Sequence, residues 1–276
     1  MMIGACVLFA VMATSVALAH ARSPGLSTFV SSAVRSATNL LLLVAMARGD
    51  VRALLGDARP ALWVRGFSGG AALITYFAAI EHLSVGEASF LNQTSAVWVV
   101  AAAPWTIGER PGLLAWIAVL GSMGGVALLA HPRPGEADAV GRALGLLSGL
   151  CAAGAYLSIR KAAASNRPAV IVFYFTLVST IASFALIAAT GAALPTDPIT
   201  WAWLVLAGAA ATWAQLVMTE AYRVGNTAAV AAAGAAGPLF TTIGGWLLLG
   251  QVPDAAGAVG MAILLVSSVV MPFYAR

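Results

Sequence analysis

The chain has 276 residues, of which 61% are hydrophobic and only 9% are charged. A soluble domain carries roughly 25% charged residues, so this composition excludes an ordinary soluble protein and indicates an integral membrane protein in contact with the lipid bilayer. The formal net charge of +4 does not indicate nucleic-acid binding, because basic residues of membrane proteins gather in cytoplasmic loops.

Apolar segments interrupted by Gly, Pro and charged residues predict ten membrane-spanning helices, since about twenty helical residues cross a hydrocarbon core of about 30 Å. Strands are excluded because open sheet edges cannot face lipid. In chain order the predicted helices cover residues 2–20, 27–47, 61–82, 86–106, 112–130, 143–163, 169–190, 199–221, 228–249 and 255–274.

Lys and Arg residues are unequally distributed between the two ends of these helices, ten against three, and Arg35 falls inside the second helix. The positive-inside rule therefore predicts a multi-pass protein of the cell membrane with both termini in the cytoplasm. The ten are Arg48, Arg52, Arg59, Arg65, Arg110, Arg160, Lys161, Arg167, Arg223 and Arg276, and the three are Arg22, Arg133 and Arg142.

The first helix ends in VALAHA, residues 16–21, which has small residues at the spacing of a signal-peptidase site. No basic residue precedes the apolar run, and removing this helix would upset the charge distribution. We therefore expect a retained helix, with a cleaved signal peptide as the alternative.

A polar loop at residues 131–142 divides the chain into two halves of five predicted helices. Shifting one half by 142 residues pairs Gly108 with Gly250, and also Glu109 with Gln251 and Pro111 with Pro253. An odd number of crossings per half places the halves in opposite orientations, as in transporters built from inverted repeats.

Residues 79–129 resemble the EamA-type repeat of the drug/metabolite transporter superfamily. The resemblance is carried by Gly86-Glu87-Ala88 at the start of the fourth predicted helix, Gly108-Glu109-Arg110 at its end, and the Gly-rich helix that follows. Arg35 matches an arginine that the family often carries in the second helix. EAYRVGNTAAV and GWLLLGQVPDAAGAVGMAIL are similar to the corresponding pieces of a second repeat.

This resemblance implies an all-α integral membrane protein with ten transmembrane helices in two inverted five-helix repeats, residues 1–131 and 141–276. It also implies a secondary transporter of small organic metabolites, such as amino acids or related compounds. The direction of net transport, the cargo, the coupling ion and the oligomeric state stay open, with export as the expected direction. Two departures are Ala96, which replaces a family proline kept at Pro238 and argues against a symmetric pair of kinks, and Gln251, which replaces an acid.

Polar residues inside apolar helices are candidates to line a cavity, because lipid cannot satisfy their hydrogen bonds. Asn92 and Ser95 share one stripe of the fourth helix, and Thr212, Gln215 and Thr219 share one stripe of the eighth. Packing between helices is the alternative for each of them. The full set of substrate-binding candidates is Arg35, Tyr76, Asn92, Ser95, Trp98, Tyr156, Thr212, Trp213, Gln215 and Thr219.

Charged residues near the membrane carry two further hypotheses. Arg35 is a candidate cation for a carboxylate on the cargo, or else a structural arginine bound to backbone carbonyls or to an acid such as Glu87. Glu81 and Glu220 are candidates for proton coupling, with a local ion pair between Glu220 and Arg223 as the alternative.

Enzymatic function is not expected, because the histidines His20, His82 and His131 lie at helix ends and no HExxH motif is present. Cys6 and Cys151 form no metal-ligand spacing with these histidines, so we expect no metal and no cofactor. A passive channel or a membrane scaffold without transport activity is the remaining alternative. Gly141, Gly145 and Gly149 are predicted to form a helix-packing surface.

Overall fold

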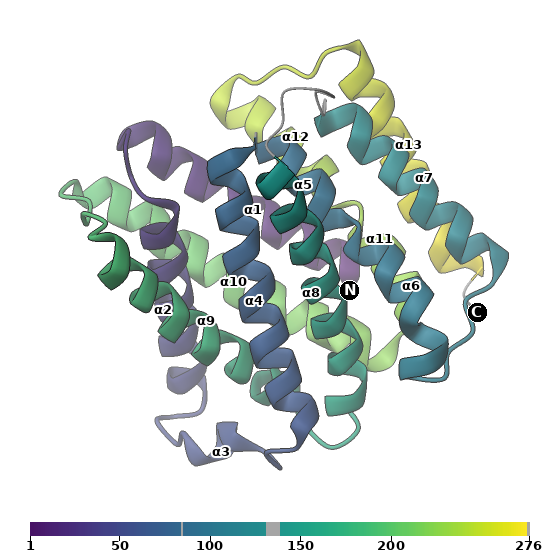
Figure 1. Cartoon of the computed structure of the whole chain (residues 1–276), viewed down its shortest axis with the longest axis horizontal. Helices are drawn as coiled ribbons and strands as arrows, with labels where there is room; N and C mark the ends of the chain where they lie inside the picture. Colours follow the sequence, from purple (N-terminus) through teal and green to yellow (C-terminus); the bar gives the residue numbers. More distant parts are fainter. Residues whose placement is uncertain (84, 131–138, 275–276) are drawn as a thin grey trace.

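The computed structural model describes residues 1–83, 85–130 and 139–274, and all the regular secondary structure of these residues is helical (Figure 1). The helices before residue 131 are α1 (Met2–Arg22), α2 (Thr28–Met46), α3 (Arg52–Leu55), α4 (Pro60–His82), α5 (Val85–Gln93), α6 (Ser95–Thr106) and α7 (Leu113–Ala130). Those that follow are α8 (Ala139–Ala162), α9 (Pro168–Thr190), α10 (Pro198–Val224), α11 (Thr227–Gly234), α12 (Gly237–Leu249) and α13 (Ala255–Tyr274).

Each of the ten predicted ranges is helical in the structure. Two of them, residues 86–106 and 228–249, are each divided into two helices, α5 and α6 in the first and α11 and α12 in the second. In the described part of the chain, seven segments are long and apolar enough to cross a membrane. They are α1, α2, α7, α8, α9, α10 and the α11–α12 segment Thr227–Leu249. The chain is therefore a helical protein suited to a multi-pass arrangement. The predicted loop residues His131 and Arg133, and the terminal Arg276, lie outside the described residues.

The fourth and ninth predicted helices are each broken near their middle, which corrects the expectation that the kinks would not be symmetric. Between α5 and α6, the hydroxyl of Thr94 donates to the carbonyl of Leu91 at 2.6 Å, and its N–H donates to the same oxygen at 3.1 Å. Between α11 and α12, Ala236 N–H donates to the carbonyl of Ala233, and Pro238 follows. The break in the first half thus has a threonine side chain beside it, and the corresponding break in the second half is followed by a proline.

Two pairs of glycines related by the 142-residue shift share the same unusual backbone conformation. Gly49 and Gly191 have φ of 81° and 64°, and Gly108 and Gly250 have φ of 75° and 68°. This left-handed region favours glycine because it has no Cβ atom. The chain therefore leaves α2 and α9, and likewise α6 and α12, through similar turns.

Helix pairs related by the 142-residue shift make corresponding contacts. α4 packs against α8 as α10 packs against α1, while α2 packs against α9 and α7 against α13. Figure 1 shows the α2–α9 pair and the α7–α13 pair at opposite sides of the bundle, with α4 and α8 between them. The helices that surround the centre thus come from both parts of the chain.

One pair of contacts departs from this symmetry. The 142-residue shift relates α6 to α12 and α5 to α11. α6 packs against α11, but within the described residues the backbones of α5 and α12 do not approach each other as closely. Small side chains fill the α6–α11 contact, including the buried Ala96, Ala103 and Ala232. The bundle is therefore more tightly packed at the α6–α11 end.

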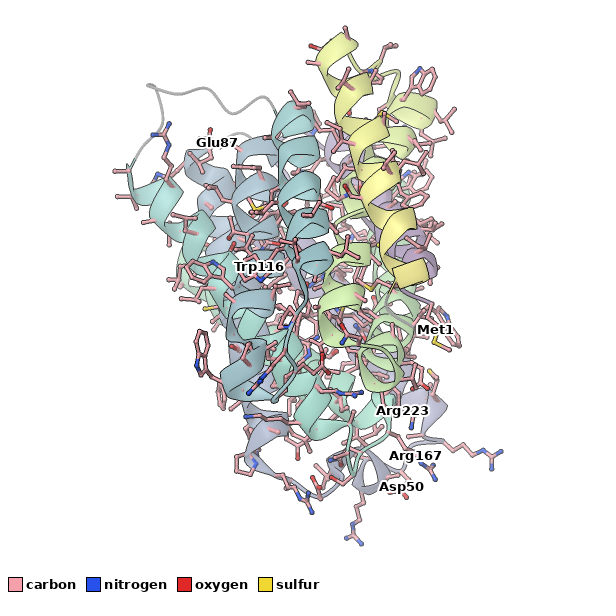
Figure 2. The ribbon with its side chains drawn as sticks, turned by 90° about the vertical axis from the view of Figure 1, so that its right-hand side faces the viewer. Met1, Asp50, Glu87, Trp116, Arg167 and Arg223 are labelled. Carbon is pink, nitrogen blue, oxygen red and sulfur yellow. The ribbon has the colours of Figure 1, made fainter. Side chains whose placement is uncertain are left out.

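Charged side chains concentrate at the two ends of the bundle. Asp50, Arg167 and Arg223 lie at one end and Glu87 lies at the other (Figure 2). Arg65 is an exception among the basic residues assigned to helix ends, because it is buried inside α4 with only 2% of its surface exposed. Arg65 therefore lies inside the bundle and not in a loop at the helix end.

Candidate functional site

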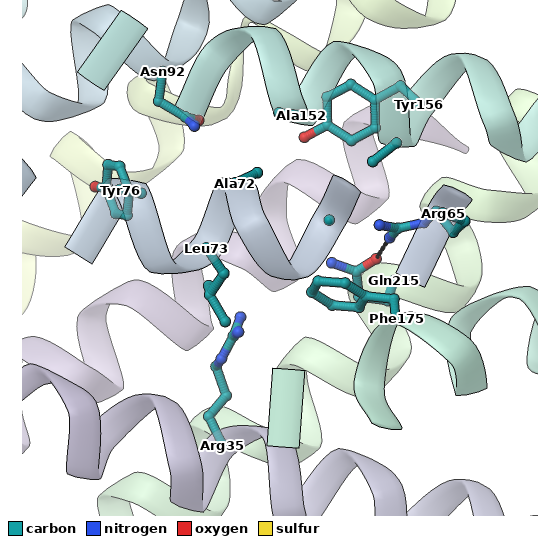
Figure 3. Close-up of a pocket in the computed structure, with 12 residues that line it drawn as sticks. Arg35, Arg65, Ala72, Leu73, Tyr76, Asn92, Ala152, Tyr156, Phe175 and Gln215 are labelled. Atoms are coloured by element: carbon teal, nitrogen blue, oxygen red, sulfur yellow. Dashed lines mark hydrogen bonds between the residues drawn. The ribbon is translucent and has the colours of Figure 1, made fainter. Parts of the chain in front are cut away.

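A cavity of about 130 Å³ lies between six helices, α2, α4, α5, α8, α9 and α10 (Figure 3). Its lining combines polar and charged side chains with small and apolar ones. The lining residues are Arg35, Arg65, Gly69, Ala72, Leu73, Tyr76, Asn92, Ala152, Ala155, Tyr156, Phe175 and Gln215. Residues from both parts of the chain thus form one polar site inside an apolar bundle.

Arg65 is held in place by contacts to two other helices, α10 and α9. Its Nη2 donates to Gln215 Oε1 of α10 at 2.8 Å, and its guanidinium carbon lies 4.3 Å from the centre of the Phe175 ring of α9. Gly69, one turn along α4, makes this possible, since a Cβ atom there would lie 2.3 Å from Arg65 Nη1. The arginine is therefore fixed by a neutral amide and an aromatic face.

Arg35 reaches the cavity from α2 and is 9% exposed. Its Nη1 lies 3.6 Å from the sulfur of Met12, and sulfur is a weak hydrogen-bond acceptor. Arg35 Nε and Arg65 Nε have no hydrogen-bond partner among the described residues. Both guanidinium groups therefore keep unused donors.

The neutral polar residues of the lining are anchored by neighbours. Asn92 Nδ2 donates to Ser148 Oγ of α8 at 3.0 Å, and the hydroxyls of Tyr76 and Ser89 are 2.8 Å apart. The rings of Tyr156 and Tyr222 stack with centroids 5.4 Å apart. These contacts fix the side chains before any ligand is bound.

Acidic side chains of the described residues are engaged elsewhere. None of the lining residues is acidic. Glu87, considered as a partner for Arg35, lies 3.4 Å from Arg142 Nε instead. Glu220 forms the predicted local ion pair with Arg223, with both carboxylate oxygens engaged. The side chain of Glu81 lies outside the described residues.

Five of the ten residues predicted from the sequence line this cavity, namely Arg35, Tyr76, Asn92, Tyr156 and Gln215. The other five are not among its lining residues. Thr212 is buried and donates back to the carbonyl of Gly208 within α10, and Trp98 and Trp213 are 41% and 52% exposed on the outside of the bundle. Ser95 and Thr219 are buried among the helices.

Arg65 was missed as a lining residue because it was assigned to a helix end. Two signals in the sequence could have identified it. Pro60 favours the first turn of a helix, so Arg65 falls in the second turn, and Gly66, Gly69 and Gly70 follow it. At Gly66 a Cβ atom would lie 2.9 Å from the carbonyl oxygen of Tyr174, so these glycines let α4 approach α9.

Glu109 joins the two parts of the chain at the α6–α11 end. Its carboxylate accepts hydrogen bonds from the backbone N–H and the hydroxyl of Thr227, at 2.8 and 3.0 Å. Arg160 Nε of α8 lies 3.4 Å from the same carboxylate, and the Arg160 guanidinium also donates to the carbonyl of Arg223. An anion at the start of α11 is favourable because the helix N-terminus carries partial positive charge.

The chain is an apolar helical bundle with a polar cavity between its two parts, an arrangement typical of multi-pass membrane transporters of small molecules. The chain belongs to the EamA-like transporter family, whose sequence profile matches residues 1–130 and 139–272.

Two relatives named as transporters agree with that assignment, and a solved structure shares the fold. The chain is 30% identical over 238 residues to the pseudopaline exporter CntI of Pseudomonas aeruginosa (strain UCBPP-PA14), covering 86% of this chain and 83% of that protein. It is 27% identical over 195 residues to a riboflavin transporter of Rhizobium johnstonii, covering 70% and 63%. A solved structure described as "Crystal structure of protein" superposes with a TM-score of 0.83 at 20% identity, covering 99% of this chain and 97% of the other.

Proposed function

We propose that this protein is a secondary transporter that exports small organic metabolites, such as amino acids or related compounds, across the cytoplasmic membrane by alternating access. The observation that carries the proposal is the polar cavity enclosed by helices from both parts of the chain. Polar side chains inside a membrane bundle mark substrate pathways, because their burial is otherwise costly. The relative named as an exporter supports the direction.

The proposed architecture is ten transmembrane segments in two inverted repeats, residues 1–131 and 141–276. The matched turns at Gly49 and Gly191 and at Gly108 and Gly250 support it, as do the breaks after α5 and after α11. Substrate sites of such transporters lie near the middle of the membrane, where broken helices meet. Asn92 at the end of α5 lies both beside a break and in the cavity.

Alternating access requires two states that differ in which end of the cavity is closed. The tight α6–α11 packing and the Glu109–Thr227 hydrogen bonds support a state that is closed at this end. The weaker approach of α5 and α12 supports access from the other end. In the opposite state, α5 and α12 close and α6 and α11 separate.

Both termini are proposed to lie in the cytoplasm, which places the α6–α11 end there too. The basic residues Arg48, Arg52, Arg59 and Arg167, all exposed, support this orientation. Fusion of alkaline phosphatase to the C-terminus should give an inactive enzyme, and fusion of a fluorescent protein should give a fluorescent one. An active phosphatase would overturn the orientation.

Counterflow into proteoliposomes tests transport itself. Vesicles loaded with an unlabelled amino acid mixture should accumulate labelled amino acids transiently, and the rate should saturate with concentration. Flux without saturation or counterflow would favour a passive channel, and no flux of any solute would favour a scaffold. Repeating the assay with a pH gradient, in the wild type and in Glu220→Gln, tests proton coupling.

Cysteine labelling tests whether the cavity is wet. On a background without Cys6 and Cys151, cysteines at Asn92 and Gln215 should react with small water-soluble thiol reagents. A cysteine at Ala214, which is fully buried on α10 beside Gln215 and outside the lining, is the matched control and should react slowly. Equal protection at all three positions would contradict a substrate cavity.

A further inference from the structure

We propose that the cavity binds a small organic dianion with two carboxylate groups, one bound by Arg35 and the other by Arg65. This assignment rests on the proposed transport function and specifies its substrate class. It follows from the charge of the cavity, from the free donors of its two arginines and from its size.

The charge of the lining is not compensated by any acid among the lining residues. Arg35 and Arg65 are both more than nine-tenths buried, and the lining contains no acid. The acids with an ion pair among the described residues pair with other arginines: Asp57 with Arg59, Glu87 with Arg142, Glu109 with Arg160, Asp197 with Arg22, and Glu220 with Arg223. Buried charges without a partner are strongly unfavourable, so two negative charges on a ligand would balance the site.

The free edges of the two guanidinium groups suit carboxylates. Phe175 covers one face of Arg65 and Gln215 Oε1 accepts from its Nη2, while Arg65 Nε has no hydrogen-bond partner among the described residues. Among the described residues, Arg35 donates to the thioether sulfur of Met12, and its Nε has no partner. A guanidinium edge offers two parallel N–H donors that match the two oxygens of a carboxylate. The side chains of Gln215 and Phe175 are drawn between the two guanidinium groups in Figure 3, which favours two separate singly charged groups over one compact dianion such as phosphate.

The size of the cavity favours a compact ligand. Its volume of about 130 Å³ is below the roughly 300–1,000 Å³ of pockets for drug-sized molecules. Leu73 and Ala72 supply an apolar wall beside the arginines, against which a short methylene chain can pack. A four- or five-carbon dicarboxylate combines these properties.

Thermal stabilisation of the purified full-length protein by glutarate tests the assignment. Glutarate should raise the Tm, while its neutral isostere glutaramide, at equal ionic strength, should not. Arg35→Gln should lower the apparent affinity for glutarate at least tenfold, and the exposed Arg52→Gln should leave it unchanged. Equal effects of glutarate and glutaramide, or a response to inorganic phosphate that exceeds the response to glutarate, would overturn the proposal.

Gln215→Glu provides a second test that does not depend on removing an arginine. It replaces a neutral acceptor 2.8 Å from Arg65 Nη2 with a carboxylate, and so supplies the missing negative charge. We expect a higher Tm than the wild type without ligand and at least a tenfold loss of glutarate affinity. If Arg65 had only a structural role, Gln215→Glu would raise the Tm without changing the affinity for glutarate. Unchanged glutarate binding in a folded Gln215→Glu protein would contradict the proposal.

The substrate class and the transport function can fail separately. Saturable counterflow of neutral amino acids that glutarate does not inhibit would reject the dianion site and keep the transporter. Glutarate binding that depends on both arginines, without flux of any solute in proteoliposomes, would keep the site and reject the transporter.

Discussion

Asp57 connects the loop before α4 to the loop before α9 through several hydrogen bonds. Its carboxylate accepts from Ser165 Oγ at 2.5 Å and from Asn166 Nδ2 at 2.8 Å, and its own N–H donates to Asn166 Oδ1. These bonds favour the ionised carboxylate and lower its pKa below the usual 3.8, with the Ser165 hydroxyl as the largest cause. The charge state of one exposed acid thus couples loops from the two parts of the chain.

This coupling predicts a pH dependence of stability. Because the pKa of Asp57 is lower in the folded than in the unfolded protein, its contribution is fully present above the unfolded pKa and is lost as the pH falls through the folded value. The Tm of the wild type in detergent should therefore fall more than that of Asp57→Asn between about pH 5 and pH 3. The decrease in Tm of Ser165→Ala should be intermediate between those of the wild type and Asp57→Asn. Parallel curves for the wild type and Asp57→Asn would contradict the prediction.

At the scale of single residues, the sequence identifies polar groups in apolar helices but not which face of each helix is central. Gln215 and Thr212 share one stripe of α10, yet only Gln215 lines the cavity, because Thr212 satisfies its hydroxyl on its own helix. Arg65 is close enough to a helix start to resemble a loop residue. Its burial depends on Phe175 and Gln215, which are more than a hundred residues away in the chain.

At the scale of helices, the glycine stripe of α8 determines how closely α8 approaches α5. A Cβ atom at Gly145 would lie 2.7 Å from Leu91 Cδ1, and one at Gly149 would lie 2.9 Å from the carbonyl oxygen of Leu91 and 2.3 Å from Thr94 Oγ1. The predicted packing role of the stripe is confirmed. Gly149 lies directly against the break between α5 and α6, so this contact also positions Asn92.

Gly149→Ala should therefore destabilise the protein. The added methyl group meets backbone as well as side chain, and overpacking of this kind costs about 1–3 kcal/mol. Gly124→Ala in α7 is the matched control, since nothing lies within 4 Å of a Cβ atom there, and alanine is the better helix former by about 1 kcal/mol. Thermal unfolding in detergent should show a lower Tm for Gly149→Ala and an equal or higher Tm for Gly124→Ala. The opposite order would show that α8 can move away from α5 at little cost.

The positions of the helices could be predicted from the sequence, whereas their interruptions could not. Apolar length determines where a helix lies, because any shorter segment would leave backbone groups exposed to lipid. A break, in contrast, depends on a nearby donor that competes with the backbone N–H groups for the carbonyl oxygens of the helix. At Thr94 that competitor is a hydroxyl, and threonine occurs just as readily in unbroken helices, as Thr212 does in α10.

At the scale of the whole molecule, the departure from symmetry is that α6 packs against α11, whereas α5 and α12 approach each other less closely in the described part of the chain. Ala232 of α11 is fully buried in the α6–α11 contact, and the 142-residue shift relates it to Phe90 of α5, which is only partly buried. If the two halves exchange conformations during transport, the exposures of these two positions should exchange as well. Glu109 stabilises the present arrangement through its bonds to Thr227.

Removing that interaction should shift the protein toward the opposite state. Hydrogen bonds to a charged group contribute about 1.5–3 kcal/mol, and 1.4 kcal/mol corresponds to a tenfold change in an equilibrium. On a background without Cys6 and Cys151, Glu109→Gln should therefore raise the rate of thiol labelling at Ala232→Cys about tenfold or more, and lower the rate at Phe90→Cys. Asp50→Asn is the control, because it removes an exposed acid whose hydrogen bond to the N–H of Arg52 lies within one loop, and should change neither rate. Faster labelling at both cysteines would mean that the bundle loosens without alternating, and would reject the two-state mechanism.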